Sequence, residues 1–298
     1  MFTIIQRKKL NSKVTSLEVF SPRIAEAILP GQYVNVQARP ESSVLTLPVC
    51  GWDTKKGSIT LLVEQLDEHT SQLATNLEIF ILHDLIGPLG QPSELTYCHD
   101  RELINSRLLF VADGIGAAIA LSQMKWLADI GCRADVMISA PTKEEMLFTS
   151  ELEKVCDNIY FITQDGSSGF HGNEAQLLEM LLNKEEKPYD LIITSGPLIM
   201  MKAVSTTAKN HGIPATVNLT PQLFESDPTQ GAFKVNTSGH LRNIAIEGPE
   251  FQALTLDFDQ TLKSLEIGIS AQESDPAAKS KIVNLPGKSD TRFSRKQA

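Results

Sequence analysis

The chain has 298 residues, of which 42% are hydrophobic and 21% are charged, and its formal net charge is −9. This length is enough for two domains, because single hydrophobic cores rarely grow beyond about 250 residues. The acidic balance argues against a nucleic-acid partner, which would require clustered Lys and Arg. No apolar run reaches the roughly 18 residues of a membrane-spanning helix, and the amino terminus does not resemble a secretory signal, so we expect a cytoplasmic protein.

Four cysteines stand far apart in the sequence, at positions 50, 98, 132 and 156. None forms a Cys-x-x-Cys pair or lies near a histidine at the spacing of metal ligands. Cys132 and Cys156 adjoin apolar runs, as the thiols of a hydrophobic core do. The six histidines are also scattered and form no recognisable nucleophilic arrangement. The sequence therefore predicts neither a metal site nor a disulfide.

Residues 1–97 are predicted to form short strands separated by turns. The segment from Lys13 to Phe20 alternates with period two, as a half-buried strand does. Further strands are expected at 32–37, 58–63 and 79–82, and one short helix from about Thr70 to Asn76. Many short strands separated by glycine turns are typical of a barrel, so we predict a small antiparallel β-barrel here.

Residues 98–215 change to alternating strands and helices. The apolar run 108–111 is followed by Asp113-Gly114-Ile115-Gly116 and by a helix that extends to Leu127. Further strands are expected at 134–138, 159–163 and 191–194, with helices at about 173–183 and 197–209. Alternation of this kind predicts a parallel sheet with helices on both faces, that is, a Rossmann-like α/β domain.

Residues 216–269 are predicted to form a smaller third lobe. It contains an irregular stretch from Thr220 to Gly231, strands at about 232–237 and 241–246, and a helix-like segment. Residues 270–298 lack periodic hydrophobicity, which predicts a disordered tail. The predicted fold class is therefore a two-domain α/β protein, in which an N-terminal antiparallel β-barrel precedes a Rossmann-like parallel domain and a small C-terminal lobe.

A barrel followed by a Rossmann-like domain is the order of the ferredoxin–NADP reductase superfamily, and five local runs make the resemblance more specific. These runs are Pro30-Gly31-Gln32-Tyr33, Gly87-Pro88-Leu89-Gly90, 163–169, 196–204 and Glu247-Gly248-Pro249-Glu250-Phe251. Over about residues 1–265 the chain resembles the small subunit of NADH-dependent ferredoxin:NADP oxidoreductase, sulfide dehydrogenase subunits and the electron-transfer subunit of class B dihydroorotate dehydrogenase.

The resemblance implies a set of cofactors and a partner. In such subunits the barrel binds FAD, the Rossmann-like domain binds NAD(P), and the third lobe binds a [2Fe–2S] cluster. The natural partner is a larger oxidoreductase subunit that contains flavin and iron–sulfur centres.

The flavin positions depart from the family pattern. The family's Arg-x-Pro-Leu-Thr run corresponds here to 44–48, where Val44 cannot neutralise a pyrophosphate. Thr46 remains a candidate flavin contact, and Arg39 is an alternative cation. The family's glycine-rich phosphate turn corresponds to 66–70, where Asp67 and Glu68 suit a helix N-terminus better than an anionic ligand. The backbone near Thr70 and the loop that contains Gly87 and Gly90 remain candidates.

The nicotinamide positions are better preserved. The family's Gly-Gly-Gly-x-Gly loop corresponds to 112–116, in which Gly114 and Gly116 are retained. Asp113, however, places a carboxylate where a pyrophosphate oxygen would lie. The other candidate positions, in two intact turns, are Asp165, Gly166, Gly196 and Pro197. The alternative is that these turns only connect strands to helices.

The cluster positions have lost their sulfur ligands. Family members hold the [2Fe–2S] cluster with a loop that contains two cysteines and with a later cysteine. The aligned loop runs from 225 to 233, and the family positions are occupied by Glu225, Gln230, Phe233 and Ala245. Iron in such clusters is held by thiolates, so we expect no [2Fe–2S] cluster and no other metal.

Three functions remain open at this point. The favoured one is a cofactor-depleted subunit that acts as a structural or regulatory partner of a larger oxidoreductase. The first alternative is an active FAD-dependent NAD(P)H reductase without the cluster, which would use Arg39, Thr46 and the backbone near Thr70. The second alternative is a nucleotide sensor that binds through Asp165, Gly166 and Gly196.

Overall fold

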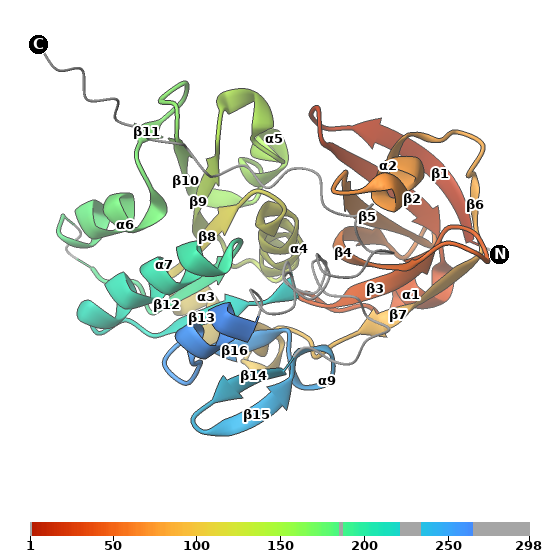
Figure 1. The fold of residues 1–298 in the computed structure, drawn as a ribbon. Helices are drawn as coiled ribbons and strands as arrows, with labels where there is room; N and C mark the ends of the chain where they lie inside the picture. The colour runs from red at the N-terminus through yellow and green to blue at the C-terminus, as the bar shows by residue number, and fades with distance from the viewer. Residues whose placement is uncertain (1, 185–186, 221–233, 265–298) are drawn as a thin grey trace, which may run out of the picture.

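The computed structural model describes residues 2–184, 187–220 and 234–264, which form two sheets of seven strands each and a two-stranded hairpin (Figure 1). The first sheet lies within the first 89 residues. Its elements are β1 (Phe2–Lys9), β2 (Val14–Phe20), α1 (Pro22–Ala27), β3 (Tyr33–Gln37), β4 (Val44–Asp53), β5 (Ser58–Glu64), α2 (Glu68–Thr75), β6 (Ile81–Leu82) and β7 (Asp84–Leu89).

This first sheet is the predicted barrel. Its strand order is β6-β1-β2-β5-β4-β3-β7, and every neighbouring pair is antiparallel. Leu17, Val34 and Leu61 are fully buried in its interior, and α2 adds Leu73 to the same core. The antiparallel sheet curls into a nearly closed barrel, as the alternating strands predict.

The second sheet is the predicted Rossmann-like domain. Its strands are β8 (Leu108–Asp113), β9 (Ala134–Ala140), β10 (Cys156–Thr163), β11 (Phe170–His171), β12 (Leu191–Ser195), β13 (Ala215–Asn218) and β16 (Glu250–Gln252). Their order is β11-β10-β9-β8-β12-β13-β16, and all pairs are parallel except β13 with β16. The chain order reverses between β8 and β12, which makes this point the topological switch of the sheet.

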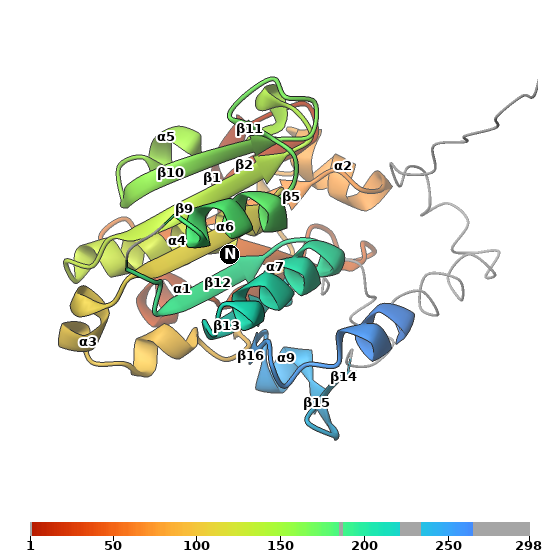
Figure 2. The same cartoon turned by 90° about the vertical axis from the view of Figure 1, so that its left-hand side faces the viewer.

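Helices cover both faces of the parallel sheet, and the connections between strands contain four shorter helical segments. The long helices are α4 (Gly116–Asp129), α6 (Glu174–Leu182) and α7 (Leu198–Asn210); the short ones are η1 (Glu94–Tyr97), α3 (Asp100–Asn105), η2 (Lys143–Glu145) and α5 (Thr149–Leu152). Figure 2 shows α6 and α7 together on one face of the sheet, and Figure 1 shows α4 between the sheet and the barrel.

The period of two along β8 explains this arrangement. Val111 packs in the cluster that contains Val204 of α7, whereas Phe110 packs in the cluster that contains Met124 of α4. The second cluster also includes Leu62 of the barrel strand β5. A continuous core therefore joins the two domains through α4.

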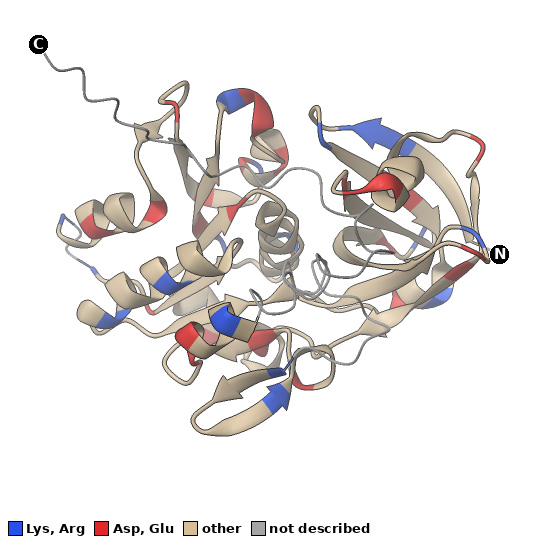
Figure 3. Cartoon of the chain, viewed as in Figure 1, with Lys and Arg blue, Asp and Glu red and all other residues tan. Residues whose placement is uncertain are grey.

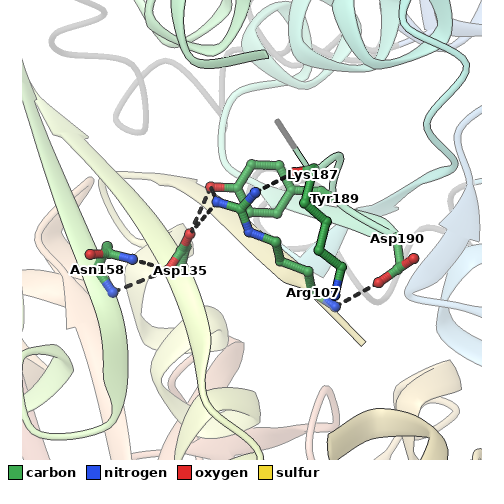
Figure 4. A network of polar contacts seen from close by, with 6 residues as sticks. All are labelled: Arg107, Asp135, Asn158, Lys187, Tyr189 and Asp190. Atoms are coloured by element: carbon green, nitrogen blue, oxygen red, sulfur yellow. Dashed lines mark hydrogen bonds and ion pairs between the residues drawn. The ribbon is translucent and has the colours of Figure 1, made fainter. Parts of the chain in front are cut away.

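A polar network fixes the amino ends of the parallel strands (Figure 4). Asp135 of β9 is 5% exposed and accepts hydrogen bonds from Tyr189 Oη at 2.7 Å and from Asn158 Nδ2 at 2.8 Å. The guanidinium of Arg107 lies 3.6 Å from Asp135 and 4.3 Å from the centre of the Tyr189 ring. Burial, and then Asp135, raise the pKa of Tyr189. This edge of the sheet is therefore braced by internal contacts.

The third lobe interrupts the parallel sheet between β13 and β16. It contains β14 (Lys234–Thr237), β15 (His240–Asn243) and α9 (Ile244–Glu247). The predicted strand at 241–246 is wrong in its second half, because Asn243 Oδ1 accepts a hydrogen bond from Ala245 N at 2.9 Å and begins α9. The predicted tail at 270–298 lies outside the described residues.

Charge is mixed over the surface of both domains (Figure 3). Among the described residues, Lys and Arg as well as Asp and Glu occur in both domains, and the basic residues form no stripe of the kind that binds nucleic acid. Within the same residues, no helix has the length and apolar character that a membrane span requires.

Candidate functional site

The carboxyl ends of β8 and β12 meet at the topological switch, where open α/β sheets bind their ligands. Two glycines permit this contact. A Cβ on Gly116 would lie 2.1 Å from the carbonyl oxygen of Ser195, and a Cβ on Gly196 would lie 2.6 Å from Cε of Met200. Gly114 has a φ of +53° and open space beside it. The structure thus brings two of the three predicted nicotinamide turns together, those at Gly116 and Gly196, and close packing alone requires Gly116.

Asp113 lies at the centre of this switch, at the end of β8. Burial of its carboxyl group and the charge of Glu174 raise the pKa of Asp113 to about 7, against the lowering effect of a hydrogen bond with Ser139. A Cβ on Gly196 would come within 3.1 Å of Cβ of Asp113, so the carboxylate stands directly beside the second turn. When it is ionised, it opposes any anion at this position.

The predicted contact Asp165 lies on the same edge of the sheet, after β10. Its Oδ1 accepts hydrogen bonds from Ser167 Oγ at 2.6 Å and Ser167 N at 2.9 Å, and these contacts lower the pKa of Asp165. Gly166 has a φ of +74°, as the tight turn requires. β9 separates this turn from Gly114 in the sheet. Pro197 precedes the first residue of α7, and its carbonyl oxygen accepts a hydrogen bond from Met201 N at 3.0 Å.

The predicted flavin contacts in the barrel are already occupied by neighbouring groups. Thr46 is 8% exposed, and its hydroxyl donates a hydrogen bond to Asn35 Oδ1 at 3.0 Å. Thr70 N donates to Asp67 Oδ1 at 2.8 Å, and Asp67 N donates to Thr70 Oγ1 at 2.9 Å. This reciprocal pair is a capping box at the start of α2. The prediction that Asp67 caps the helix is confirmed, and Glu68 lies in the first helical turn.

The segment with Gly87 and Gly90, at the end of the barrel, contacts the third lobe at Pro249. A Cβ on Gly87 would lie 2.6 Å from Cγ1 of Val34. At Gly90, with a φ of +75°, a Cβ would lie 2.8 Å from the ring of Tyr33 and 3.0 Å from Cδ of Pro249. Both glycines are therefore explained by close packing, because β3 with Val34 and Tyr33, the segment from Gly87 to Gly90 and the segment at Pro249 approach one another closely.

Glu250 is a buried functional group that the sequence reasoning did not single out. It is 8% exposed and accepts hydrogen bonds from Ser93 Oγ at 3.2 Å, Glu94 N at 3.3 Å and Gln123 Nε2 at 3.0 Å. Burial raises the pKa of Glu250 to about 7, despite these hydrogen bonds. One sign of this buried carboxylate is visible in the sequence. An acidic residue precedes Phe251, at a strand position where an apolar residue would be expected.

Comparisons with known proteins agree with this architecture. No family model matches the chain. It is 33% identical over 263 residues to an uncharacterized protein of Clostridium beijerinckii, covering 88% of this chain and 89% of that protein. It is 28% identical to a dihydroorotate dehydrogenase B (NAD(+)) electron transfer subunit homolog of Thermotoga maritima, with the same coverage.

A solved structure supports the assignment of this chain to a family. A chain of the NADH-dependent reduced ferredoxin–NADP oxidoreductase superposes with a TM-score of 0.78 at 26% identity, over 91% of this chain and 97% of that one. The chain belongs to the ferredoxin–NADP reductase superfamily. Within that superfamily it is similar to electron-transfer subunits of larger oxidoreductase complexes.

The ferredoxin-reductase fold is present, and the positions that the sequence analysis assigned to cofactors carry the following side chains. Ala245 has no metal-binding side chain, and none of the four cysteines of the sequence falls between 157 and 298. Among the described residues, no cluster of His, Cys, Asp or Glu could hold a metal ion. At the position that the sequence analysis aligned with the family's flavin-binding arginine, the chain has the uncharged Val44. At the predicted nicotinamide position, the turns at Gly116 and Gly196 lie in close contact, with Asp113 beside them.

Proposed function

We propose that this chain is a cofactor-depleted, ferredoxin-reductase-type subunit of a cytoplasmic NAD(P)H-linked electron-transfer complex. It acts as a structural or regulatory partner of a larger subunit that contains flavin and iron–sulfur centres. In this proposal the chain contributes its shape to the complex and does not relay electrons, because a scaffold requires the fold but not the cofactor ligands.

One observation carries the proposal: the polar groups at the flavin positions are bonded to their own neighbours. The hydroxyl of Thr46 donates a hydrogen bond to Asn35, and the backbone N–H and the hydroxyl of Thr70 both donate to the carboxylate of Asp67. A bound flavin would compete with these internal partners for the donors of Thr46 and Thr70, without gaining a cation at Val44. The loss of the thiolate ligands at 230, 233 and 245 supports the same conclusion.

Two other functions are kept as alternatives. An active FAD-dependent reductase is favoured by the intact Gly87-Pro88-Leu89-Gly90 loop. A nucleotide sensor is favoured by the close contact of the turns at Gly116 and Gly196, which forms the usual nucleotide position of the sheet.

Equilibrium titrations of the purified chain with FAD and with NADH separate the three functions. We expect no saturable quenching of FAD fluorescence at micromolar concentrations. Saturable FAD binding would overturn the proposal in favour of the reductase, and saturable NADH binding without FAD binding would favour the sensor. The FAD titration is repeated with Val44→Arg, which restores a cation; tighter FAD binding by this variant would show that the assay detects the site.

A further inference from the structure

A cavity of about 180 Å³ lies between the barrel and the Rossmann-like domain. Its walls are formed by β1, β2, β4 and β5 of the barrel and by α4, α5 and the residue before α5 in the other domain. None of the predicted flavin or nicotinamide positions lines it. Ligand pockets often form at domain interfaces, and those for drug-sized ligands measure about 300–1,000 Å³. This cavity therefore suits a smaller molecule.

Polar contacts between the two domains hold the walls of the cavity together. Lys8 Nζ of β1 lies 3.8 Å from Glu151 Oε1 of α5. Next to this pair, Lys13 Nζ lies 2.9 Å from Glu145 Oε2, and Asn11 Nδ2 donates a hydrogen bond to the carbonyl oxygen of Glu145 at 3.1 Å. These contacts tie the turn between β1 and β2 to the segment before α5, so the cavity has a defined shape.

The aromatic wall of the cavity has an unusual backbone conformation. Phe148, directly before α5, has a φ of +58° and a ψ of +22°, in the left-handed region. Bulky residues are uncommon there and persist only where their surroundings hold them. Phe148 packs against the core cluster that contains Leu121 of α4, and both residues line the cavity. The fold thus places an apolar wall on this side.

The cavity lining holds two lysines and two glutamates. Lys8 and Glu151 pair with each other, and Glu18 Oε1 lies 4.0 Å from Nζ of Lys56. The remaining lysine is Lys125 of α4, which is half-buried. Among the described residues, no carboxylate forms an ion pair with Lys125. The lining therefore contains one cation that is not neutralised.

The ammonium group of Lys125 lies against the barrel wall. A Cβ on Gly51 of β4 would lie 3.4 Å from Nζ of Lys125, so the lack of a side chain at Gly51 leaves room for this group. The adjacent Cys50 is 2% exposed, and burial raises the pKa of its thiol to about 12. The thiol is therefore protonated at neutral pH and cannot act as the counter-ion of Lys125.

An unpaired cation beside an apolar wall selects the class of ligand. The charge of Lys125 favours an anion, and Leu121 and Phe148 favour an apolar body. A second negative charge on the ligand is disfavoured, because Glu18 and Glu151 also line the cavity. We propose that this cavity binds a small organic monocarboxylate, whose carboxylate pairs with Lys125 Nζ and whose apolar body contacts Leu121 and Phe148. This site does not depend on the proposed function.

The test is isothermal titration calorimetry of the full chain with benzoate at pH 7. We expect saturable one-to-one binding, and binding weaker by about tenfold or more for benzyl alcohol, which has the ring but no charge. Lys125→Met keeps the length of the side chain without its charge and should weaken benzoate binding by about tenfold or more. Lys209→Met, an equal charge change at an exposed position of α7, should leave the affinity unchanged.

Three results would overturn the proposal. They are no saturable binding of benzoate to the wild-type chain, equal affinities for benzoate and benzyl alcohol, and a loss in Lys125→Met no greater than that in Lys209→Met. Circular dichroism checks the fold of each variant. Lys125→Gln, a second uncharged variant with a polar side chain, decides the question if Lys125→Met does not fold.

Discussion

At the scale of single residues, the polar groups at the predicted cofactor positions and in the core fall into two kinds. Thr46 and Thr70 keep hydrogen-bonding groups but use them internally, within a strand pair and a capping box. Asp113 and Glu250 instead place carboxyl groups in buried positions, where burial raises the pKa of each to about 7. Only the second kind creates groups that titrate near neutral pH, and both carboxyl groups are open to direct tests.

Replacing Asp113 with glycine should strengthen nucleotide binding. The change removes the carboxylate from the nucleotide position and restores a glycine of the family loop, so we expect NADH to bind about tenfold more tightly at pH 8. The measurement is NADH fluorescence at pH 6 and pH 8. The gain should shrink at pH 6, where the wild-type carboxyl is largely protonated. Asp113→Asn removes only the charge and should give part of the gain; equal affinities for all three proteins would contradict this role of Asp113.

Replacing Glu250 with glutamine should flatten the dependence of stability on pH. The folded chain holds the Glu250 proton up to a pKa of about 7, whereas the ordinary value is 4.5. The stabilising contribution is therefore full below about pH 4.5 and is lost as the pH rises through 7. Urea unfolding between pH 5 and pH 8 should show a decline in the wild type that is smaller in the variant by on the order of 2 kcal/mol.

The matched control for that measurement is Glu102→Gln, since Glu102 is exposed on α3. The unfolding free energy of Glu102→Gln should decline between pH 5 and pH 8 as much as that of the wild type. If the unfolding free energy of Glu250→Gln declines with pH as steeply as that of the wild type, the assignment of a raised pKa to Glu250 is wrong.

At the scale of elements, the contact between α4 and β12 sets the geometry of the switch. Gly116→Ala would place a methyl group 2.1 Å from the backbone oxygen of Ser195, so we expect a loss of about 2 kcal/mol or more in unfolding free energy. Gly131→Ala, with a φ of +84° and open space, should cost about 1 kcal/mol through backbone strain alone. Urea unfolding compares the two, and an equal or smaller loss for Gly116→Ala would rule out the packing argument.

Most elements could be predicted from periodicity, and the errors have local causes. The alternating residues of β2 and the apolar run of β8 were sufficient for their assignment. Alternation is typical of a strand with one exposed face, and a continuous apolar run is typical of a strand that helices cover on both faces. The strand expected up to residue 246 ends at Asn243, since a side-chain cap overrides the strand pattern of Leu241 to Ile246. Caps are decided by one hydrogen bond, which hydrophobic periodicity does not register.

The candidate site was harder to predict from the sequence than the fold. The turns at Gly114 and Gly196 could be chosen because glycines follow apolar strands, and the structure brings these two together. The burial of Glu250 could not be foreseen, because its partners Ser93 and Gln123 lie more than a hundred residues earlier in the chain. Contacts of such separation depend on the packing of the barrel, α4 and β16.

At the scale of the whole molecule, the fold is that of the ferredoxin–NADP reductase superfamily. The continuous core through α4 joins barrel and sheet, and the loop at Gly90 joins the barrel to the third lobe. None of these contacts requires a cofactor. The proposed scaffold role therefore requires only contacts that the fold itself supplies.

The most direct test of this account is the visible absorption spectrum of the full chain purified under anaerobic conditions, with acid-released cofactor identified by chromatography and iron measured. The account predicts a spectrum without flavin bands, no released FAD and no stoichiometric iron. Flavin bands that bleach on addition of NADH or NADPH, with FAD released in near-equimolar amount, would contradict it and identify the chain as an active reductase.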